Sequence, residues 1–221
     1  MKIKTFGTEN DEDVDFYYSH FSGGIMGSAF NLHHGSRKIR IKWNLQGEHQ
    51  AQNACGAAAL GLYAGMSFSA IAAGLSRTEL PGLRARITEK NGVNYYNDAY
   101  NANPASMRAL IKMIRNSIDH GDIAEKDVIL VIGDMLELGE ESLAEHIRIA
   151  ENALNAGLDK VCFVGGEFAK ALQQIESKDH ALSFKTSDEL AEWLKENVLH
   201  DNVVLIKGSR GTRMEKIMEA L

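Results

Sequence analysis

The sequence has little of several features that mark specialised classes of protein. It contains only two cysteines, Cys55 and Cys162, and neither belongs to a Cys-x-x-Cys motif or a Cys/His metal-binding pattern. No apolar run approaches the roughly 20 residues that span a bilayer, and no signal-peptide core follows Met1. The formal net charge of −6 argues against a nucleic-acid-binding surface. We therefore expect a cytoplasmic protein with buried free thiols, no nucleic-acid partner and no membrane insertion.

Three common catalytic or phosphate-binding motifs are also missing. The sequence has no Gly-x-x-x-x-Gly-Lys-Ser/Thr phosphate loop, no Gly-x-Gly-x-x-Gly dinucleotide motif and no Gly-x-Ser-x-Gly nucleophile elbow. The chain therefore lacks the loop that would hold a nucleoside triphosphate unaided. It does have 44% hydrophobic residues among 221, which is ample for a packed core.

Pro81 separates two parts with different patterns. Before it, residues 38–45 alternate charged and apolar side chains, which predicts one arm of an antiparallel hairpin, and an Ala-rich helix is expected over 49–64. After it, strands and helices alternate, which predicts a mainly parallel α/β sheet. The expected order is strand 93–98, helix 104–118, strand 128–132, helix 141–156, strand 160–164, helix 167–175, helix 187–197, strand 203–206 and helix 211–220. We place the domain boundary between residues 80 and 81.

Polar residues follow three of the predicted strands, in segments 97–104, 133–139 and 207–211. The carboxyl ends of parallel strands share one edge of a sheet, and open α/β sheets bind their ligands there. The candidate site residues in these segments are Asp98, Tyr100, Asn101, Asn103, Asp134, Glu137, Lys207, Ser209 and Arg210. A simpler interpretation stays open for each segment: a turn in the first, acidic residues that favour a helix dipole in the second, and a tight strand-to-helix turn in the third.

Other candidates lie outside these segments. His49 and Asn53 stand four residues apart, on one face of the expected helix, where an Asn side chain could recognise a base or simply be a buried amide. Arg84 could reach a phosphate or form a surface ion pair. His146, on the helix after the second strand, is expected to point towards Asp134.

Taken together, and in their order along the chain, these segments resemble motifs of the Mur ligases. Residues 47–53 are similar to the family's Gly-x-His-Asn-x-x-Asn segment, with Gln50 where Asn is usual, and residues 80–84 resemble its interdomain stretch. Three further motifs resemble members that act on D-alanyl-D-alanine: Asp-x-Tyr-Asn-Ala-Asn-Pro at 98–104, Gly-Asp-Met-Leu-Glu-Leu-Gly at 133–139 and Lys-Gly-Ser-Arg-Gly-x-x-Met-Glu at 207–215. The resemblance covers nearly the whole chain.

The resemblance also implies two domains. Residues 1–80 would be the end of a central ATPase domain, and residues 81–221 a Rossmann-like carboxyl-terminal domain. The phosphate loop, the Mg²⁺ ligands and an amino-terminal domain would then precede residue 1. We therefore expect the chain alone to be an inactive monomer that holds no metal by itself.

The implied activity is an ATP- and Mg²⁺-dependent ligase of peptidoglycan synthesis. It would join D-alanyl-D-alanine to UDP-N-acetylmuramoyl-tripeptide through an acyl phosphate. The residues implied to contact ATP are His49, Asn53, Arg84 and Asp98, the last two with catalytic roles. Those implied to bind the other substrates are Tyr100, Asn101, Asn103, Asp134, Glu137, Lys207, Ser209 and Arg210. The alternatives are another amide ligase of this kind, such as a folylpolyglutamate synthase, and a non-catalytic nucleotide- or peptide-binding module.

Overall fold

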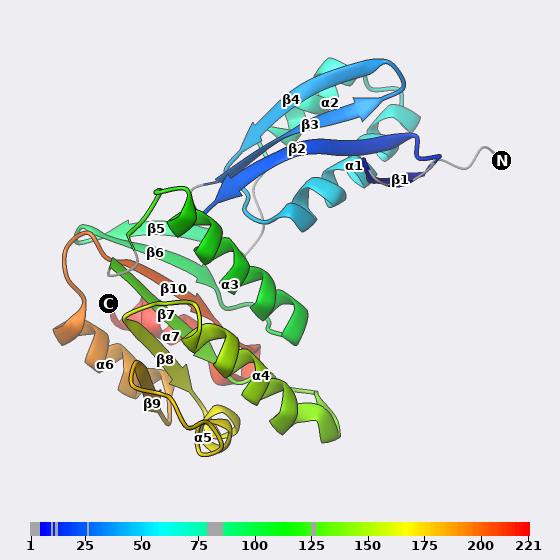
Figure 1. Cartoon of the computed structure of the whole chain (residues 1–221). Helices are drawn as coiled ribbons and strands as arrows, with labels where there is room; N and C mark the ends of the chain where they lie inside the picture. The colour runs from blue at the N-terminus through cyan, green and yellow to red at the C-terminus, as the bar shows by residue number, and fades with distance from the viewer. Residues whose placement is uncertain (1–4, 10, 12, 26, 79–85, 125–126) are drawn as a thin grey trace. The chain divides into compact units, whose positions relative to one another are not determined.

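The chain forms two compact units, Met1–Leu80 and Pro81–Leu221 (Figure 1). The computed structural model describes residues 5–9, 11, 13–25, 27–78, 86–124 and 127–221. Each unit combines one β-sheet with helices. Within the described ranges, no helix is both long enough and apolar enough to cross a membrane.

The first unit is a four-stranded sheet covered on one face by two helices. The strand order is β1-β2-β3-β4, with β1 parallel to β2 and the other pairs antiparallel. The elements are β1 (Phe6–Thr8), β2 (Phe16–Gly24), β3 (Gly27–His34), β4 (Arg37–Trp43), α1 (Glu48–Tyr63) and α2 (Phe68–Leu75). Alternating side chains of β4, such as Ile41 and Trp43, enter the core with small residues of α1, such as Ala51 and Ala58. The predicted hairpin arm and helix are thereby confirmed.

The second unit is a six-stranded sheet in the order β5-β6-β10-β7-β8-β9, in which only β5 runs antiparallel to its neighbour. Its strands are β5 (Arg86–Lys90), β6 (Val93–Asp98), β7 (Val128–Gly133), β8 (Lys160–Val164), β9 (Ala181–Phe184) and β10 (Val203–Lys207). Its helical elements are α3 (Pro104–Asp119), η2 (Gly139–Glu141), α4 (Ser142–Leu154), α5 (Gly166–Leu172), α6 (Ser187–Asn197), η3 (Arg210–Thr212) and α7 (Glu215–Ala220). The predicted mainly parallel sheet is confirmed.

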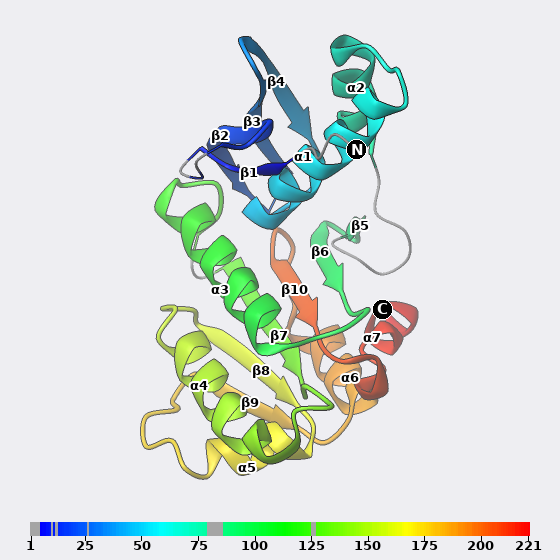
Figure 2. The same cartoon turned by 90° about the vertical axis from the view of Figure 1, so that its right-hand side faces the viewer.

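Helices cover both faces of this sheet. Figure 2 shows α3, α4 and α5 on one face and α6 with α7 on the other. The strands β7 and β10 are buried along their whole length, which explains why their sequences are continuously apolar. Cys162 of β8 is also buried, and burial raises the pKa of its thiol to about 12.

Some expected boundaries were wrong for local reasons. The helix expected over 211–220 is split into η3 and α7, because Arg213 adopts the left-handed conformation with φ of 51°. The helix expected over 167–175 ends at Leu172. The strands β5 and β9 were not expected, since both are short edge strands without a long apolar run.

The strand register brings the polar segments together. Lys207 at the end of β10 lies beside Asp98 of β6 on one side and Ile132 of β7 on the other. The loops that follow β6, β7 and β10 therefore leave the same edge of the sheet, as the sequence predicted.

Candidate ligand site at the carboxyl edge of the parallel sheet

A buried ion pair joins the ends of β6 and β10. Lys207 Nζ lies 2.5 Å from Asp98 Oδ2 and donates a second hydrogen bond, of 3.0 Å, to the carbonyl oxygen of Asn101. The side chain of Lys207 is 3% exposed, whereas that of Asp98 is 24% exposed. Burial of the ammonium group is tolerated because the carboxylate and the carbonyl replace its water ligands. Asp98 can therefore still face a ligand, while Lys207 is shielded from one.

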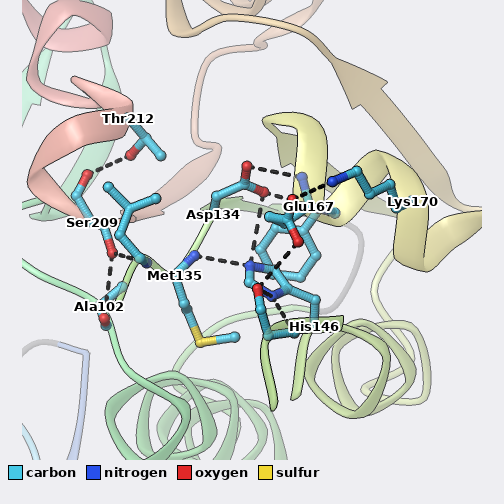
Figure 3. A network of polar contacts seen from close by, with 11 residues as sticks. Ala102, Asp134, Met135, His146, Glu167, Lys170, Ser209 and Thr212 are labelled. Carbon is cyan, nitrogen blue, oxygen red and sulfur yellow. Dashed lines mark hydrogen bonds and ion pairs between the residues drawn. The ribbon is translucent and has the colours of Figure 1, made fainter. Parts of the chain in front are cut away.

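Ser209 ties three loops to one another (Figure 3). Its buried hydroxyl accepts a 2.9 Å hydrogen bond from the amide of Leu136 and donates one of 3.4 Å to the carbonyl oxygen of Ala102. Its amide donates to the carbonyl oxygen of Asp134 at 3.2 Å, and Thr212 Oγ1 donates to its carbonyl oxygen at 2.6 Å. Because its polar atoms are engaged, Ser209 fixes the relative positions of the loops that follow β6, β7 and β10.

Asp134, at the end of β7, caps the helix that follows the neighbouring strand. Its carboxylate accepts hydrogen bonds from the amides of Glu167 at 3.0 Å and Phe168 at 2.9 Å, in the first turn of α5. A carboxylate at this position also interacts favourably with the helix dipole. Gly165 lies against the same carboxylate, since a Cβ there would come within 2.2 Å of Asp134 Oδ2. The loop after β7 is therefore locked to the loop after β8.

His146, on α4, binds the loop that follows β7, as the sequence predicted. The imidazole is fully buried; Nε2 accepts a 3.0 Å hydrogen bond from the amide of Met135, and Nδ1 lies 2.7 Å from the carbonyl oxygen of Ser142 (Figure 3). A carbonyl only accepts and an amide only donates, so these contacts assign a neutral ring with its proton on Nδ1. Asp134 Oδ1 lies 3.9 Å from Nε2.

The remaining candidates of this edge are exposed. Tyr100 is 42% exposed, and Asn101, Asn103, Glu137 and Arg210 are exposed as well. Asn103 also caps α3, because its side chain accepts from the amide of Ser106 at 2.8 Å. These five exposed side chains form the rim of the candidate site, and they are the ones that can contact a ligand.

The first unit presents the other two described candidates. His49 and Asn53 are exposed and lie four residues apart on α1, and Asn53 Nδ2 donates to Gln50 Oε1 at 3.2 Å. The interpretation of Asn53 as a buried amide is thus wrong. Cys55, on the buried side of the helix, has its thiol pKa raised to about 12 by burial. Arg84 lies outside the described residues.

A cleft of about 390 Å³ opens in the second unit where four loops meet. The loop after β9, residues 185–188, supplies one wall, and Leu136, Gly165 and Arg213 come from the loops after β7, β8 and β10. The sequence did not indicate that this loop lines a cleft, because β9 is a short edge strand without a long apolar run. The spacing of Thr186 and Glu189 does predict the start of α6, and the Thr186 side chain caps this helix by accepting from the amide of Glu189 at 3.2 Å. In the described parts of the chain, no group of three or more His, Cys, Asp or Glu side chains could hold a metal ion.

The second unit is a Rossmann-like domain: its sheet is mainly parallel, helices cover both faces, and polar loops interlock at the carboxyl edge. The model of the family described as "Mur ligase, glutamate ligase domain" matches residues 83–210. The chain belongs to the Mur ligase family.

Similar proteins extend the match over the whole chain. The UDP-N-acetylmuramoyl-tripeptide--D-alanyl-D-alanine ligase of Escherichia coli (strain K12) is 32% identical over 215 residues, which are 96% of this chain and 45% of that protein. The protein of the same name from Bacillus subtilis (strain 168) is 31% identical over 225 residues, 100% of this chain and 47% of that one. The chain thus spans about half the length of the curated relatives it matches.

Solved structures agree with the fold. A crystal structure of MurF from Acinetobacter baumannii has a TM-score of 0.86 at 28% identity and covers 99% of this chain and 46% of that one. MurF of Thermotoga maritima in complex with ADP has a TM-score of 0.77 at 22% identity and covers 97% of this chain and 47% of that one. At that identity, the second likeness concerns the fold alone.

Proposed function

We propose that this chain supplies the carboxyl-terminal part of an ATP-dependent ligase that joins D-alanyl-D-alanine to UDP-N-acetylmuramoyl-tripeptide. The observation that carries the proposal is the set of three interlocked loops, whose sequences resemble motifs of that ligase and whose relative positions are held by hydrogen bonds of Ser209. Identity of about one third to ligases of this name, over nearly all of the chain, supports it.

Met1–Leu80 would then be the end of a central ATPase domain and Pro81–Leu221 the carboxyl-terminal domain. We further propose a cytoplasmic monomer, in line with the composition that the sequence shows.

ATP suits the donors and acceptors that this chain presents. His49 and Asn53 offer exposed ring and amide groups on one face of α1, where they would contact the adenine. The partly exposed carboxylate of Asp98 would accept from the ribose hydroxyls, while Lys207 keeps it oriented. Arg84 would contact the γ-phosphate. When bound with Mg²⁺, ATP supplies the phosphoryl group that converts the tripeptide carboxylate into an acyl phosphate.

The peptide substrates would meet the exposed rim. Tyr100, Asn101 and Asn103 from one loop, with Glu137 and Arg210 from two others, would orient the dipeptide amine and the activated carboxylate. Preorganised donors and acceptors of this kind stabilise charge that develops during acyl transfer. In the loops behind that rim, Asp134, Lys207 and Ser209 would contribute by holding those side chains in place, because their own polar atoms are already bonded.

Phosphate release tests this function. We expect no release by the chain alone in the presence of ATP, Mg²⁺, UDP-N-acetylmuramoyl-tripeptide and D-alanyl-D-alanine, because no phosphate loop is present. A chimera that places the unmatched half of the Escherichia coli relative before this chain should release phosphate only when both peptide substrates are present. Cooperative unfolding of the chimera would show that it is folded. A folded chimera that releases no phosphate would contradict the proposal. Tight ATP binding by the chain alone would instead favour a non-catalytic nucleotide-binding module.

A further inference from the structure

We propose that Gln50 orients the side-chain amide of Asn53 and thereby makes α1 select adenine over purines that carry an oxygen at position 6. This role rests on the proposed function, in which Asn53 contacts the adenine of ATP. It falls on the position where the chain departs from the family's Gly-x-His-Asn-x-x-Asn segment. Gln50 would act through Asn53, as a positioning residue that determines specificity.

Gln50 and Asn53 form a hydrogen-bonded pair on the surface of α1. They lie three residues apart near the start of this helix, and residues with that spacing are neighbours on a helix surface. Asn53 Nδ2 donates a hydrogen bond of 3.2 Å to Gln50 Oε1. Gln50 is half-buried, whereas Asn53 is exposed. The half-buried side chain therefore holds one that a ligand can reach.

This hydrogen bond decides which way the Asn53 amide faces. A carboxamide has an oxygen that accepts and a nitrogen that donates two hydrogens, and its two orientations have nearly the same shape. In the observed orientation one N–H of Asn53 is bonded to Gln50, while Oδ1 and the second N–H form no hydrogen bond within the described ranges. A rotation of the amide by 180° would set Asn53 Oδ1 against Gln50 Oε1, two acceptors. The observed orientation is therefore favoured.

The groups that remain on Asn53 match the edge of adenine. Adenine carries an amino donor at position 6 beside a ring-nitrogen acceptor, and an Asn side chain pairs with both at once. Asn53 Oδ1 would accept from the amino group while the second N–H donates to the ring nitrogen. Hypoxanthine has an oxygen at position 6, so it would place an acceptor against Oδ1. It could pair fully only with the rotated amide, which loses the hydrogen bond to Gln50.

The imidazole of His49 provides a flat surface one turn before Asn53. Gly47 has φ of 88°, and a Cβ there would come within 2.6 Å of His49 Cε1. The ring therefore lies against the backbone at the start of α1, and His49 is exposed. Aromatic rings of this kind stack on bases. A ring for the face of a purine and an amide for its edge thus lie on the same side of one helix.

The first test measures the side-chain NH₂ signals of Asn53 in the ¹⁵N-labelled 221-residue chain. Gln50→Met should move the hydrogen-bonded proton upfield because its acceptor is lost, whereas Gln50→Glu should keep the bond because Glu still offers an oxygen. The matched control is Gln52→Met, which removes an exposed amide from the same helix and should leave the signals in place. Unchanged Asn53 signals in Gln50→Met would overturn the proposal.

The second test compares the binding of ATP and inosine triphosphate to the chimera described above, by calorimetry and without peptide substrates. The ratio of the two affinities cancels any effect of a variant on the triphosphate, which both nucleotides share. The chimera should bind ATP about 10-fold more tightly, a preference within the range of one bidentate pair. Gln52→Met should keep this ratio.

Variants at position 50 should change the ratio according to their donors and acceptors. Gln50→Met should lower it to about 3-fold or less, and Gln50→Lys, which only donates, to about 1. Gln50→Glu should raise it above the wild-type value, because the Gln amide can itself rotate whereas a carboxylate offers oxygens in either orientation. All three replacements are good helix formers, so α1 should remain folded.

The outcomes separate this role from the proposed function. Equal ratios in the wild type, Gln50→Met and Gln50→Lys would overturn the role of Gln50, and product formation by the same chimera would leave the ligase proposal intact. A preference for ATP that depends on Gln50, in a folded chimera that forms no product, would support the role and contradict the ligase. A folded chimera that binds neither nucleotide would contradict both.

Discussion

The ion pair between Lys207 and Asp98 should stabilise the second unit by a measurable amount. Lys207→Met removes the ammonium group that donates hydrogen bonds to the Asp98 carboxylate and to the Asn101 carbonyl oxygen. Removing one partner of a buried pair costs about 3–5 kcal/mol. Because the Asp98 side chain is 24% exposed, we expect the lower end, about 3 kcal/mol. With an m-value of about 2 kcal/mol per M urea, the unfolding midpoint of this unit falls by about 1.5 M.

The assay is urea unfolding followed by the fluorescence of Trp193, which lies in the second unit, with Trp43→Phe removing the signal of the first. A cycle with Asp98→Asn should give a coupling energy of about 2 kcal/mol, since the two side chains share one interaction. The matched control is Lys170→Met, which removes an exposed partner of Glu167 and should cost less than about 1 kcal/mol. Additive effects of Lys207→Met and Asp98→Asn, or equal losses of stability at positions 207 and 170, would contradict a stabilising interaction between Lys207 and Asp98.

Two more predictions concern backbone fit and thiol chemistry. Gly165→Ala should lower the free energy of unfolding of the second unit by about 2 kcal/mol or more in the same assay, because φ is 116° and the new Cβ would meet the carboxylate of Asp134. The control, Gly166→Ala, should leave the free energy of unfolding unchanged, because nothing lies within 4 Å of the Cβ that it adds. Equal effects of the two substitutions would contradict this explanation. Cys55 and Cys162 should not react with Ellman's reagent at pH 8 in the folded chain, since a thiol with a pKa of about 12 is almost wholly protonated there; fast reaction without denaturant would contradict their burial.

The sequence predicted the central part of the second unit because its signals are local. Residues 128–132 are continuously apolar and form β7, and Asn103 followed by Pro104 marks the start of α3. By contrast, β5 and β9 lie at the two edges of the sheet, where half-exposed strands have no strong apolar pattern. The first unit shows the same limit, since only β4 of its strands has a clear alternation.

The site was predicted as a set of residues but not as a set of contacts. The pairing of Lys207 with Asp98, 109 residues apart, depends on β10 lying beside β6, which the order of strands along the chain does not reveal. Likewise Asp134 caps α5 only because β7 and β8 are neighbours. Which polar residues bind a ligand and which hold the loops therefore depends on strand order.

Analysis of the reaction product tests directly the proposal that this chain belongs to a ligase for D-alanyl-D-alanine. The chimera with the unmatched half of the Escherichia coli relative is incubated with ATP, Mg²⁺, UDP-N-acetylmuramoyl-tripeptide and an equimolar mixture of D-alanyl-D-alanine, D-glutamate and L-glutamate. Mass spectrometry should find one new product, heavier than the tripeptide substrate by one dipeptide minus one water. A product that contains glutamate instead, from a chimera that releases phosphate, would contradict the claim.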